Sequence, residues 1–303
     1  FVDSHITTIQ RNAVMSWKAL MERVEVWLVG EEPGVEAAAR ELGVNYIAEV
    51  ERTSSGTPRI DSIFDRLRAQ SNAQYLCYVN ADILLFPDLL ISLDRVIEST
   101  DRFLLVGQRW DMNITTSLPI DQNWHAAFLA SFKDHAKLHP PAGSDYFIFP
   151  RTEFQEIPPF AVGRIGWDNW MIYHARRSHM DVIDCTGAIT AVHQNHDFRH
   201  LPGGKKHRRQ PESLENVNLA GGRQAMFTLA NANKCISDGK VAKPRFSRAT
   251  LQREIAIWPL INLRPAWLAR LVYTLANPKK VAEDRKNEKR MKENIAKTIK
   301  ESS

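Results

Sequence analysis

The sequence predicts an α/β fold in which a doubly wound, mixed sheet is flanked by helices. Segments with the patterns of strands and of helices alternate through the first third of the 303-residue chain. Alternation of this kind is typical of sheets whose parallel strands are joined by helical crossovers. With 44% hydrophobic and 25% charged residues, the chain has the composition of a globular protein that can bury a full core.

The alternation is seen in the hydrophobic pattern, which has period two in strands and about 3.6 in helices. Strands are expected over residues 6–9, 24–29, 46–50, 75–80 and 103–107. Helices are expected over residues 35–42, 58–69 and 87–98. The turns after the strands should lie along one edge of the sheet, at residues 10–12, 30–32, 56–58 and 80–82.

Polar side chains gather at these turns, and they suit a base, a ribose and a metal-bound diphosphate. The candidates for binding such a donor are Gln10, Arg11, Asn12, Glu31, Thr57, Asp61 and Asn80. The segment 75–86 is the most informative, because only Asn80 and Asp82 interrupt its apolar run. A carboxylate at the end of a strand can hold a divalent cation against a phosphorylated ligand; alternatively, it caps the next helix.

Beyond residue 107 the pattern becomes irregular and rich in polar and aromatic residues. Trp167 and Trp170 flank Asp168, and apolar walls there would raise the pKa of this carboxyl group toward the range of a general base. Both tryptophans also suit stacking on sugar rings, so they are candidates for binding an acceptor. The alternative is a helix that starts with Asp168 as its N-cap and keeps both tryptophans in the core.

Histidines follow an expected strand at residues 188–192. His193 stands at the end of this strand, where we expect it to reach a cation held by Asp82. A zinc site built from His193, His196, Asp197 and His200 is disfavoured, because the spacing matches no standard zinc motif and no cysteine joins it.

Several classes of protein are disfavoured by what the sequence lacks. It has neither a Gly-x-Gly-x-x-Gly fingerprint nor a Walker loop, which argues against a dehydrogenase and a P-loop ATPase. No run of about 18 uncharged apolar residues occurs, and the first residues lack the order of a signal peptide. Its three cysteines are far apart, which favours a reducing compartment. We therefore expect a cytoplasmic protein.

The C-terminal third is expected to be helical and basic. Helices are expected over residues 214–232 and 251–275, followed by a charged helical or flexible tail at 276–303. The apolar and basic helix 251–275 either packs on the core or lies peripherally on a membrane surface. The loop 200–211 carries basic residues at 205–209 and is a candidate lid. No nucleic-acid partner is expected.

Six motifs, taken in order, resemble those of one known group of proteins. They are Ile9–Trp17, Val79–Asp82, Val106–Asp111, Gly143–Phe147, Gly166–Trp170 and Val192–His196. Their order and spacing look like those of nucleotide-diphospho-sugar transferases of the GT-A fold and, more narrowly, of a glycosyltransferase-like family of bacteria and plants. The resemblance covers about residues 5 to 200. It implies a nucleotide-sugar-binding and catalytic domain at 1–200, a lid and packed helices at 201–275, and a tail at 276–303.

The resemblance implies a metal-assisted glycosyltransferase. Asp82 stands where that fold has the ligand of its Asp-x-Asp motif, for Mn²⁺ or Mg²⁺, and Asn80 replaces the first Asp. His193 matches a further metal ligand, and Asp168 matches the base of inverting members; in a retaining reaction it would only orient the acceptor. The implied donor contacts are Glu31 to the nucleoside, and Arg109 and Asp145 to the sugar or pyrophosphate.

The implied partners are a nucleotide-diphospho-sugar donor and a glycan or other hydroxyl acceptor. Two rival functions use the same residues. One is a noncatalytic nucleotide- or glycan-binding protein of the same fold, in which Asn80 reflects a lost metal site. The other is a metal-dependent phosphohydrolase or nucleotidyltransferase, in which water or a sugar phosphate is the second substrate.

Overall fold

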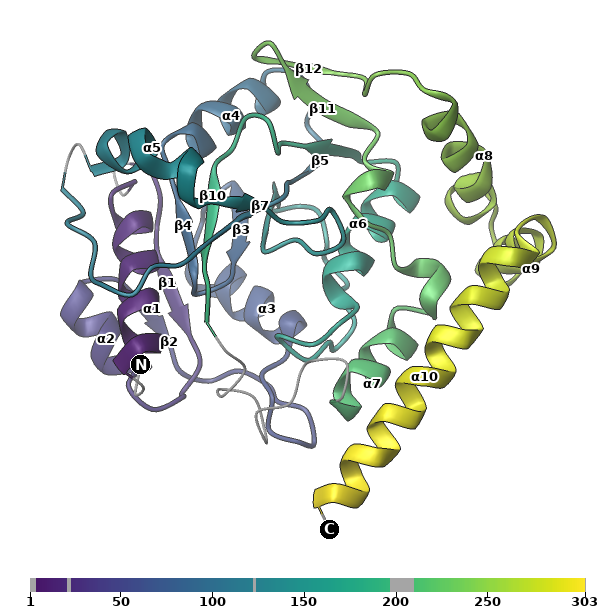
Figure 1. Ribbon diagram of the computed structural model, residues 1–303, viewed down its shortest axis with the longest axis horizontal. Coiled ribbons are helices and arrows are strands. Elements are labelled where there is room, and N and C mark those ends of the chain that lie inside the picture. Colours follow the sequence, from purple (N-terminus) through teal and green to yellow (C-terminus); the bar gives the residue numbers. More distant parts are fainter. Residues whose placement is uncertain (1–3, 21–22, 122–123, 197–209, 303) are drawn as a thin grey trace.

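A six-stranded mixed sheet lies at the centre of the molecule (Figure 1). The computed structural model describes residues 4–20, 23–121, 124–196 and 210–302. In spatial order the strands are β12 (Lys240–Ala242), β11 (Lys234–Ser237), β9 (Asp181–Asp184), β5 (Phe103–Val106), β8 (Tyr146–Pro150) and β3 (Tyr75–Val79). Strands β3, β5, β9 and β11 run in one direction, whereas β8 and β12 run in the other. The expected α/β class with a mixed sheet is therefore confirmed.

Helices cover both faces of this sheet, and alternating side chains explain why. Leu104 and Val106 of β5 pack in one apolar cluster with α3 (Ile60–Gln70) and α6 (Trp167–Arg177). Phe103 and Leu105 belong to a second cluster, which includes residues of α1 (Ser4–Lys18), α2 (Val35–Leu42) and α4 (Asp88–Ile97). Successive side chains of a strand point to opposite faces, so a strand that is apolar throughout is buried on both.

Two smaller sheets extend the core. One has the order β4 (Ile83–Leu85), β10 (Ala191–Gln194), β6 (Trp110–Met112) and β7 (Lys137–Leu138). It packs against α5 (Trp124–His135) through a third apolar cluster. The other is the parallel pair of β1 (Trp27–Val29) and β2 (Asn45–Ile47). Because only three residues separate β3 from β4, the four-stranded sheet continues from the edge of the large one.

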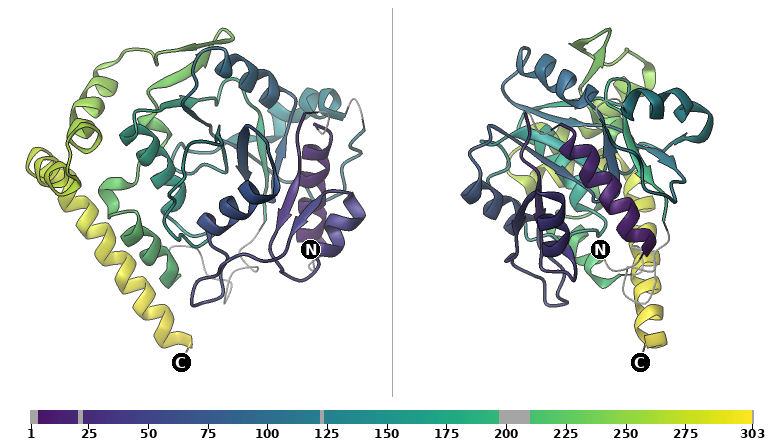
Figure 2. Two further views of the ribbon diagram at one scale, coloured as in Figure 1. Left: turned by 180° about the vertical axis from the view of Figure 1, so that it is seen from behind. Right: turned by 90° about the vertical axis from the view of Figure 1, so that its left-hand side faces the viewer.

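The C-terminal part of the chain is mainly helical and lies along one side of the molecule (Figure 2). It contains α7 (Pro211–Leu219), two 3₁₀ turns (Arg223–Ala225 and Leu229–Asn231), α8 (Arg248–Asn262), α9 (Ala266–Ala276) and α10 (Pro278–Ser302). The end of α10 extends beyond the other elements, but Met291 and Ile295 within it are buried. Among the described helices, none has both the length and the apolar character that crossing a bilayer requires.

The expected strand at residues 6–9 and the expected turn at 10–12 are wrong, because both lie inside α1. Ile9, Ala13 and Trp17 recur every four residues and are buried, which is the pattern of a helix packed along one face. The β-branched residues at the start of this segment favour a strand only weakly, and tertiary packing outweighs that preference.

The two expected C-terminal helices are shorter than the sequence suggested. Residues 251–275 form α8 and α9, separated by Pro265, whose ring disfavours a helical conformation at the preceding residue. The helix expected over 214–232 ends at Leu219. Gly221 and Gly222 follow with φ of 94° and 97°, a left-handed conformation that interrupts a helix and that glycine adopts without strain.

A buried carboxylate ties α7 to the loop that follows β2. Glu212 accepts hydrogen bonds from the hydroxyls of Thr53 at 2.5 Å and Thr57 at 2.8 Å. It also pairs with Arg164, whose Nε lies 2.9 Å from Oε2, and both side chains are less than one tenth exposed. The charge of each partner is thus compensated inside the protein only while the other is present.

We expect Glu212→Ala to lower the free energy of unfolding by about 3–5 kcal/mol, because it leaves the Arg164 guanidinium buried and unpaired. Urea denaturation followed by circular dichroism measures this loss. Glu36→Ala is the matched control, since it breaks an exposed pair with Arg40 on α2 and should cost less than about 0.5 kcal/mol. Equal losses in the two variants would contradict the prediction.

Candidate functional site

Strand ends bring Asp82, His193 and His196 together. Asp82 lies in the turn between β3 and β4, and His193 lies in β10, opposite Ile83 of β4. Nε2 of His196 is 3.0 Å from Oδ2 of Asp82, and Nε2 of His193 is 3.5 Å from the same oxygen. One ligand atom from each of the three side chains lies within 4.8 Å of the other two.

This cluster fits a divalent cation. Two ligands about 2.1 Å from a metal and at right angles are about 3 Å apart, which matches these separations. The other carboxylate oxygen of Asp82, Oδ1, is buried and has no hydrogen-bond partner in the part of the chain that the structure describes. An unsatisfied buried acceptor costs roughly 1–3 kcal/mol, and a cation would satisfy it.

The environment keeps Asp82 in the ionised form that a metal ligand needs. Burial opposes its charge, but hydrogen bonds from His193 and His196 and their electrostatic attraction outweigh burial. Together they hold the pKa of the Asp82 carboxyl below its usual value. A carboxylate and two imidazoles are a donor set that divalent transition metals accept.

A second network is centred on Arg109. Its Nε donates to Asp111 at 2.9 Å, and its Nη1 donates to Asp145 at 2.6 Å. Burial lowers the pKa of Arg109, but the two carboxylates more than compensate and raise it. Asn80 Nδ2 donates to the second oxygen of Asp145 at 2.7 Å, and His139 contacts Asp111 at 2.7 Å. The guanidinium is thus fixed by two carboxylates, and Arg109 lines the cleft.

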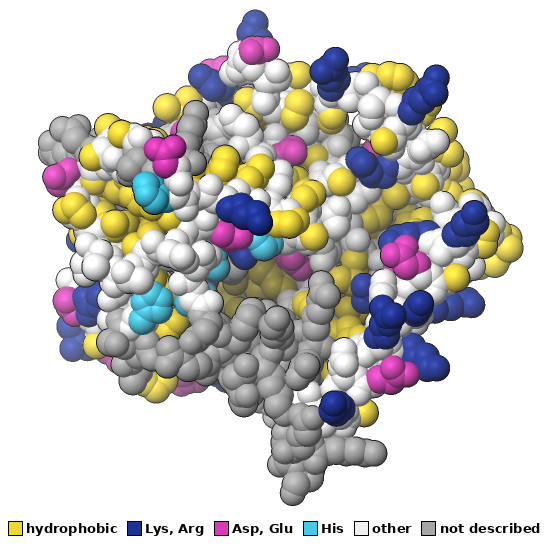
Figure 3. Space-filling view, viewed as in Figure 1, with side chains coloured by type: hydrophobic (Ala, Val, Ile, Leu, Met, Phe, Trp, Pro, Cys, Tyr) yellow, Lys and Arg dark blue, Asp and Glu magenta, His cyan; other side chains and the backbone are white. Residues whose placement is uncertain are grey.

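Both groups open into one cleft of about 2100 Å³. Its walls include the edge of the sheet, the start of α6 and one side of α10. Figure 3 shows a hollow on this face of the molecule, with acidic and histidine side chains beside it. Trp167 forms part of the wall, and its ring meets that of Tyr78 edge-on at 4.7 Å between centroids.

Asp168 lies in the first turn of α6 and lines the same cleft. Burial raises the pKa of this carboxyl, backbone N–H groups partly offset that effect and the charge of Asp145 adds to it, and the net result is a pKa of about 6. Burial raises the pKa of the Tyr78 hydroxyl, and the charges of Asp82, Asp145 and Asp168 raise it further, so all three carboxylates lie near this side chain. Asp168 can therefore gain or lose a proton near neutral pH.

Nine of the residues predicted from sequence line this cleft. They are Gln10, Thr57, Asn80, Asp82, Arg109, Asp145, Trp167, Asp168 and His193. Thr57 is nonetheless engaged structurally, because its hydroxyl donates to Glu212. The other five predicted residues, Arg11, Asn12, Glu31, Asp61 and Trp170, do not line it.

Three of these five are engaged in ion pairs elsewhere, so their predicted donor contacts need correction. Arg11 is on the outer side of α1, where it forms a two-fold hydrogen-bonded pair with Glu41. Asp61 pairs with Arg59 at 2.5 Å, and Glu31 pairs with Arg52 at 3.3 Å. The prediction assumed that these residues follow strands at one edge of the sheet. Arg11 does not, because it lies inside the helix α1.

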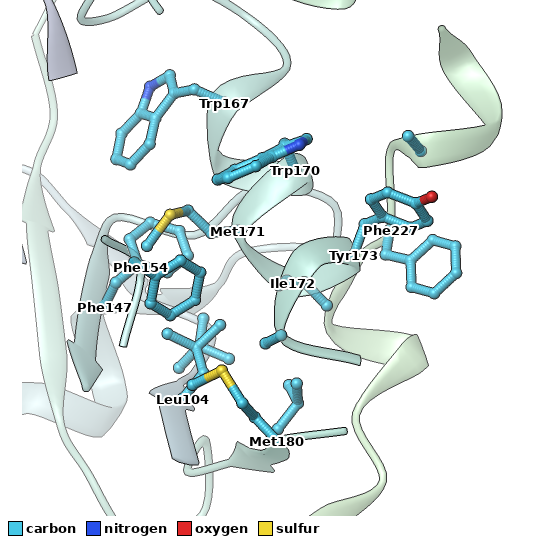
Figure 4. Close-up of a cluster of buried hydrophobic side chains, with 14 of the residues drawn as sticks. Leu104, Phe147, Phe154, Trp167, Trp170, Met171, Ile172, Tyr173, Met180 and Phe227 are labelled. Carbon is cyan, nitrogen blue, oxygen red and sulfur yellow. The ribbon is translucent and has the colours of Figure 1, made fainter. Parts of the chain in front are cut away.

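The other two are internal. Asn12 is buried and hydrogen-bonds to the side chain of Gln194, which holds α1 against β10. Trp170 is 6% exposed and packs between Phe160 and His174 in the apolar cluster of Figure 4. It cannot stack on a sugar in this position, and the core role considered as its alternative is the one found.

The structure adds three residues that the sequence did not select: Asp111, His139 and His196. Asp111 could have been predicted from the sequence. It follows Arg109 by two residues, and side chains two apart in an extended chain point to the same side. His196 was set aside with the zinc motif, and His139 gave no signal. Asp197, His200 and the predicted basic lid at 205–209 lie outside the described residues.

The comparisons with known proteins give no family for this chain. No protein-family model matches the sequence, and no curated protein matches it. A functional assignment therefore rests on the residues of the cleft and on their geometry.

We expect metal-free protein to bind Mn²⁺ through the Asp82 cluster. His196→Ala should raise the dissociation constant at least about tenfold, and Asp82→Asn should raise it more, because each removes a ligand atom. Isothermal titration calorimetry measures both. His125→Ala on α5, outside the cleft, is the control and should bind as the wild type does. Unchanged affinity in both cluster variants would exclude this site.

We also expect Asp168 to make stability depend on pH. Its folded-state pKa of about 6 lies above the usual 3.8, so the contribution of this carboxyl to stability is greatest below about pH 4 and is lost as the pH rises through about 6. Asp168→Asn should therefore stabilise the fold by up to about 3 kcal/mol more at pH 7.5 than at pH 4. Denaturation at the two pH values measures the difference. Asp101→Asn, which removes an exposed carboxyl outside the cleft, is the control; a difference independent of pH counts against the prediction.

Proposed function

We propose that this protein is a metal-assisted glycosyltransferase that moves a sugar from a nucleotide-diphospho-sugar to an acceptor hydroxyl. The single observation that carries the proposal is the pairing of two sites in one cleft. One is a carboxylate–imidazole cluster with an orphaned buried oxygen on Asp82, and the other is Asp168 with a pKa of about 6. The first suits a cation that binds phosphates, and the second suits a general base.

The proposal includes the GT-A fold, which the order of the sequence motifs implies. The central sheet with helices on both faces and the short turn from β3 to β4 that carries Asp82 support this assignment. Asn80 departs from the Asp-x-Asp pattern, and its amide donates to Asp145 instead. The two histidines therefore supply the further protein ligands that a single carboxylate lacks.

The charges of the cleft favour a reaction that needs a cation. Asp111 and Asp145 contact the guanidinium of Arg109, and the carboxylates of Asp82, Asp145 and Asp168 all lie near Tyr78. A diphosphate placed among these carboxylates would be repelled unless a divalent ion first offset part of their charge. Of the two ions that the resemblance implies, Mn²⁺ suits the donor set better, because Mg²⁺ prefers oxygen ligands. Asp82, His193 and His196 would hold this ion, which would offset the charge that develops on the departing nucleoside diphosphate.

Arg109 would position the donor. Its Nε and one N–H of Nη1 already donate to Asp111 and Asp145, so its remaining N–H groups would bind a phosphate or sugar oxygen. Asp111 and Asp145 fix the guanidinium plane, so the side chain loses little freedom when a ligand binds. Trp167 lines the cleft next to Asp168 but is only 4% exposed, so it supports the wall from within the core and does not stack on an acceptor ring in this position.

Asp168 would act as the base. It takes the proton from the acceptor hydroxyl while that oxygen bonds to the anomeric carbon and the bond from this carbon to phosphate breaks. The configuration at the anomeric carbon is inverted. A pKa of about 6 leaves Asp168 ionised at neutral pH, yet basic enough to help, and such assistance is typically worth about 10²–10⁴ in rate.

The test combines binding with turnover. A panel of UDP-, GDP-, CDP- and dTDP-sugars with Mn²⁺ is screened by thermal shift, since a ligand at 100 times its dissociation constant stabilises by about 2.7 kcal/mol. Products with candidate acceptors are then identified by mass spectrometry. We expect Asp168→Asn to lower transfer about 10²–10⁴-fold while donor binding persists, and Asp82→Asn to abolish the Mn²⁺-dependent shift.

Asp101→Asn, which removes an exposed carboxyl outside the cleft, serves as the control. The proposal is contradicted if Asp82→Asn and Asp168→Asn both transfer sugar at the wild-type rate. Release of phosphate or of a nucleoside monophosphate without transfer would point to a phosphohydrolase. A donor-dependent shift with no product from any acceptor would point to a noncatalytic binding protein.

A further inference from the structure

Helices α8 and α9 expose large apolar side chains in regular stripes. Leu251, Ile255 and Trp258 recur at intervals of four and three along α8, and they are 47%, 65% and 54% exposed. Trp267, Leu271 and Leu275 recur every four residues along α9, with 66%, 49% and 74% exposed. This spacing puts the three residues of each helix on one side of it.

The opposite sides of both helices pack on the protein, so the exposed stripes are separate from the core. Ile257, Leu260 and Ile261 of α8 are buried, and so are Ala269 and Tyr273 of α9. The two helices contact each other and lie at the outer edge of the molecule (Figure 1). Ile255 and Trp258 also line a hollow of about 550 Å³ between α8 and the end of α6.

The apolar exposure is concentrated in this part of the chain. Of the ten exposed large hydrophobic side chains among the described residues, seven fall between residues 246 and 275. We call these seven the α8–α9 face: Phe246, Leu251, Ile255, Trp258, Trp267, Leu271 and Leu275. Scattered apolar residues are normal on a surface, but such a concentration marks a contact surface.

Positive charge is concentrated there too. Residues 243–279 contain seven Lys and Arg against one acid, Glu254, which already pairs with Arg176. The rest of the chain contains 33 basic and 34 acidic residues, so this segment accounts for all of the net charge of +5. Six of the seven basic residues are exposed, the exception being Arg253. Figure 3 shows Lys and Arg next to hydrophobic side chains along the right-hand edge, where α8 and α9 lie.

We propose that the α8–α9 face docks on an anionic membrane surface. Apolar side chains that include two tryptophans suit the boundary between lipid head groups and acyl chains, and the surrounding basic residues attract anionic head groups. This inference is independent of the proposed catalytic function.

The charge also argues against a second copy of the chain as the occupant. A symmetric dimer through this face would bring two copies of the same basic segment together, and six exposed cations on each side would repel one another. An anionic bilayer removes that conflict, because its charge is opposite to that of the segment.

Co-sedimentation with vesicles tests the proposal. We expect the full chain to bind vesicles of phosphatidylglycerol and phosphatidylcholine, to bind pure phosphatidylcholine at least tenfold more weakly, and to lose affinity as salt is added. The double variant Trp258→Ser, Trp267→Ser should partition into the mixed vesicles at least tenfold less. Ile91→Ser, which removes a 50% exposed residue of α4, is the matched control and should bind as the wild type does.

A charge variant tests the same face without changing its apolar residues. Arg248→Glu, Arg264→Glu should lower binding to the anionic vesicles more than tenfold and leave the thermal unfolding temperature unchanged, since both side chains are exposed. Wild-type partitioning by both double variants overturns the proposal. So does a dimer detected by analytical ultracentrifugation without lipid and lost in the tryptophan variant, because it would assign the face to a second copy.

Discussion

The register between β3 and β8 decides where the polar side chains of the cleft lie. Five consecutive pairs, from Tyr75 opposite Pro150 to Val79 opposite Tyr146, fix the two strands. Every residue of β8 is buried, so a slip of one position would exchange the two apolar clusters that its side chains enter. Asn80 and Asp145 come immediately beyond the last pair, which is why they bond to each other. The position of Asp82 follows from the same turn.

The cleft concentrates negative charge that the rest of the fold must accommodate. Asp82 and Asp168 show two outcomes of similar burial. Two histidines lower the pKa of the first, whereas the second has no cationic partner among the described residues and its pKa rises to about 6. Carboxyl groups whose environments separate their pKa values commonly have different chemical roles. Their charges oppose folding, and the apolar clusters on both faces of the sheet must outweigh that cost.

Local patterns in the sequence predict much of this fold, but contacts between distant segments do not follow from them. The helices at 35–42 and 87–98 and the strands at 75–80 and 103–107 are found within a residue or two, because their apolar patterns are regular. In α1, packing along one helix face overrides β-branched residues. Asp82 and Asp168 were recognisable from their neighbours in sequence. The role of His196 was not, because it depends on the pairing of β10 with β4 and β6.

The pairing of β10 with β4 and β6 has a consequence for the order of folding and metal binding. More than one hundred residues separate Asp82 from His193, and their side chains meet only after β10 has joined the four-stranded sheet. Closing so long a segment of chain has an entropic cost, which apolar packing, rather than the binding of a single ion, must offset. A cation would therefore bind at the proposed site only after the chain has folded. Which ion that site would hold would then depend on the metals available around the finished protein, and one ion could be exchanged for another without unfolding the chain.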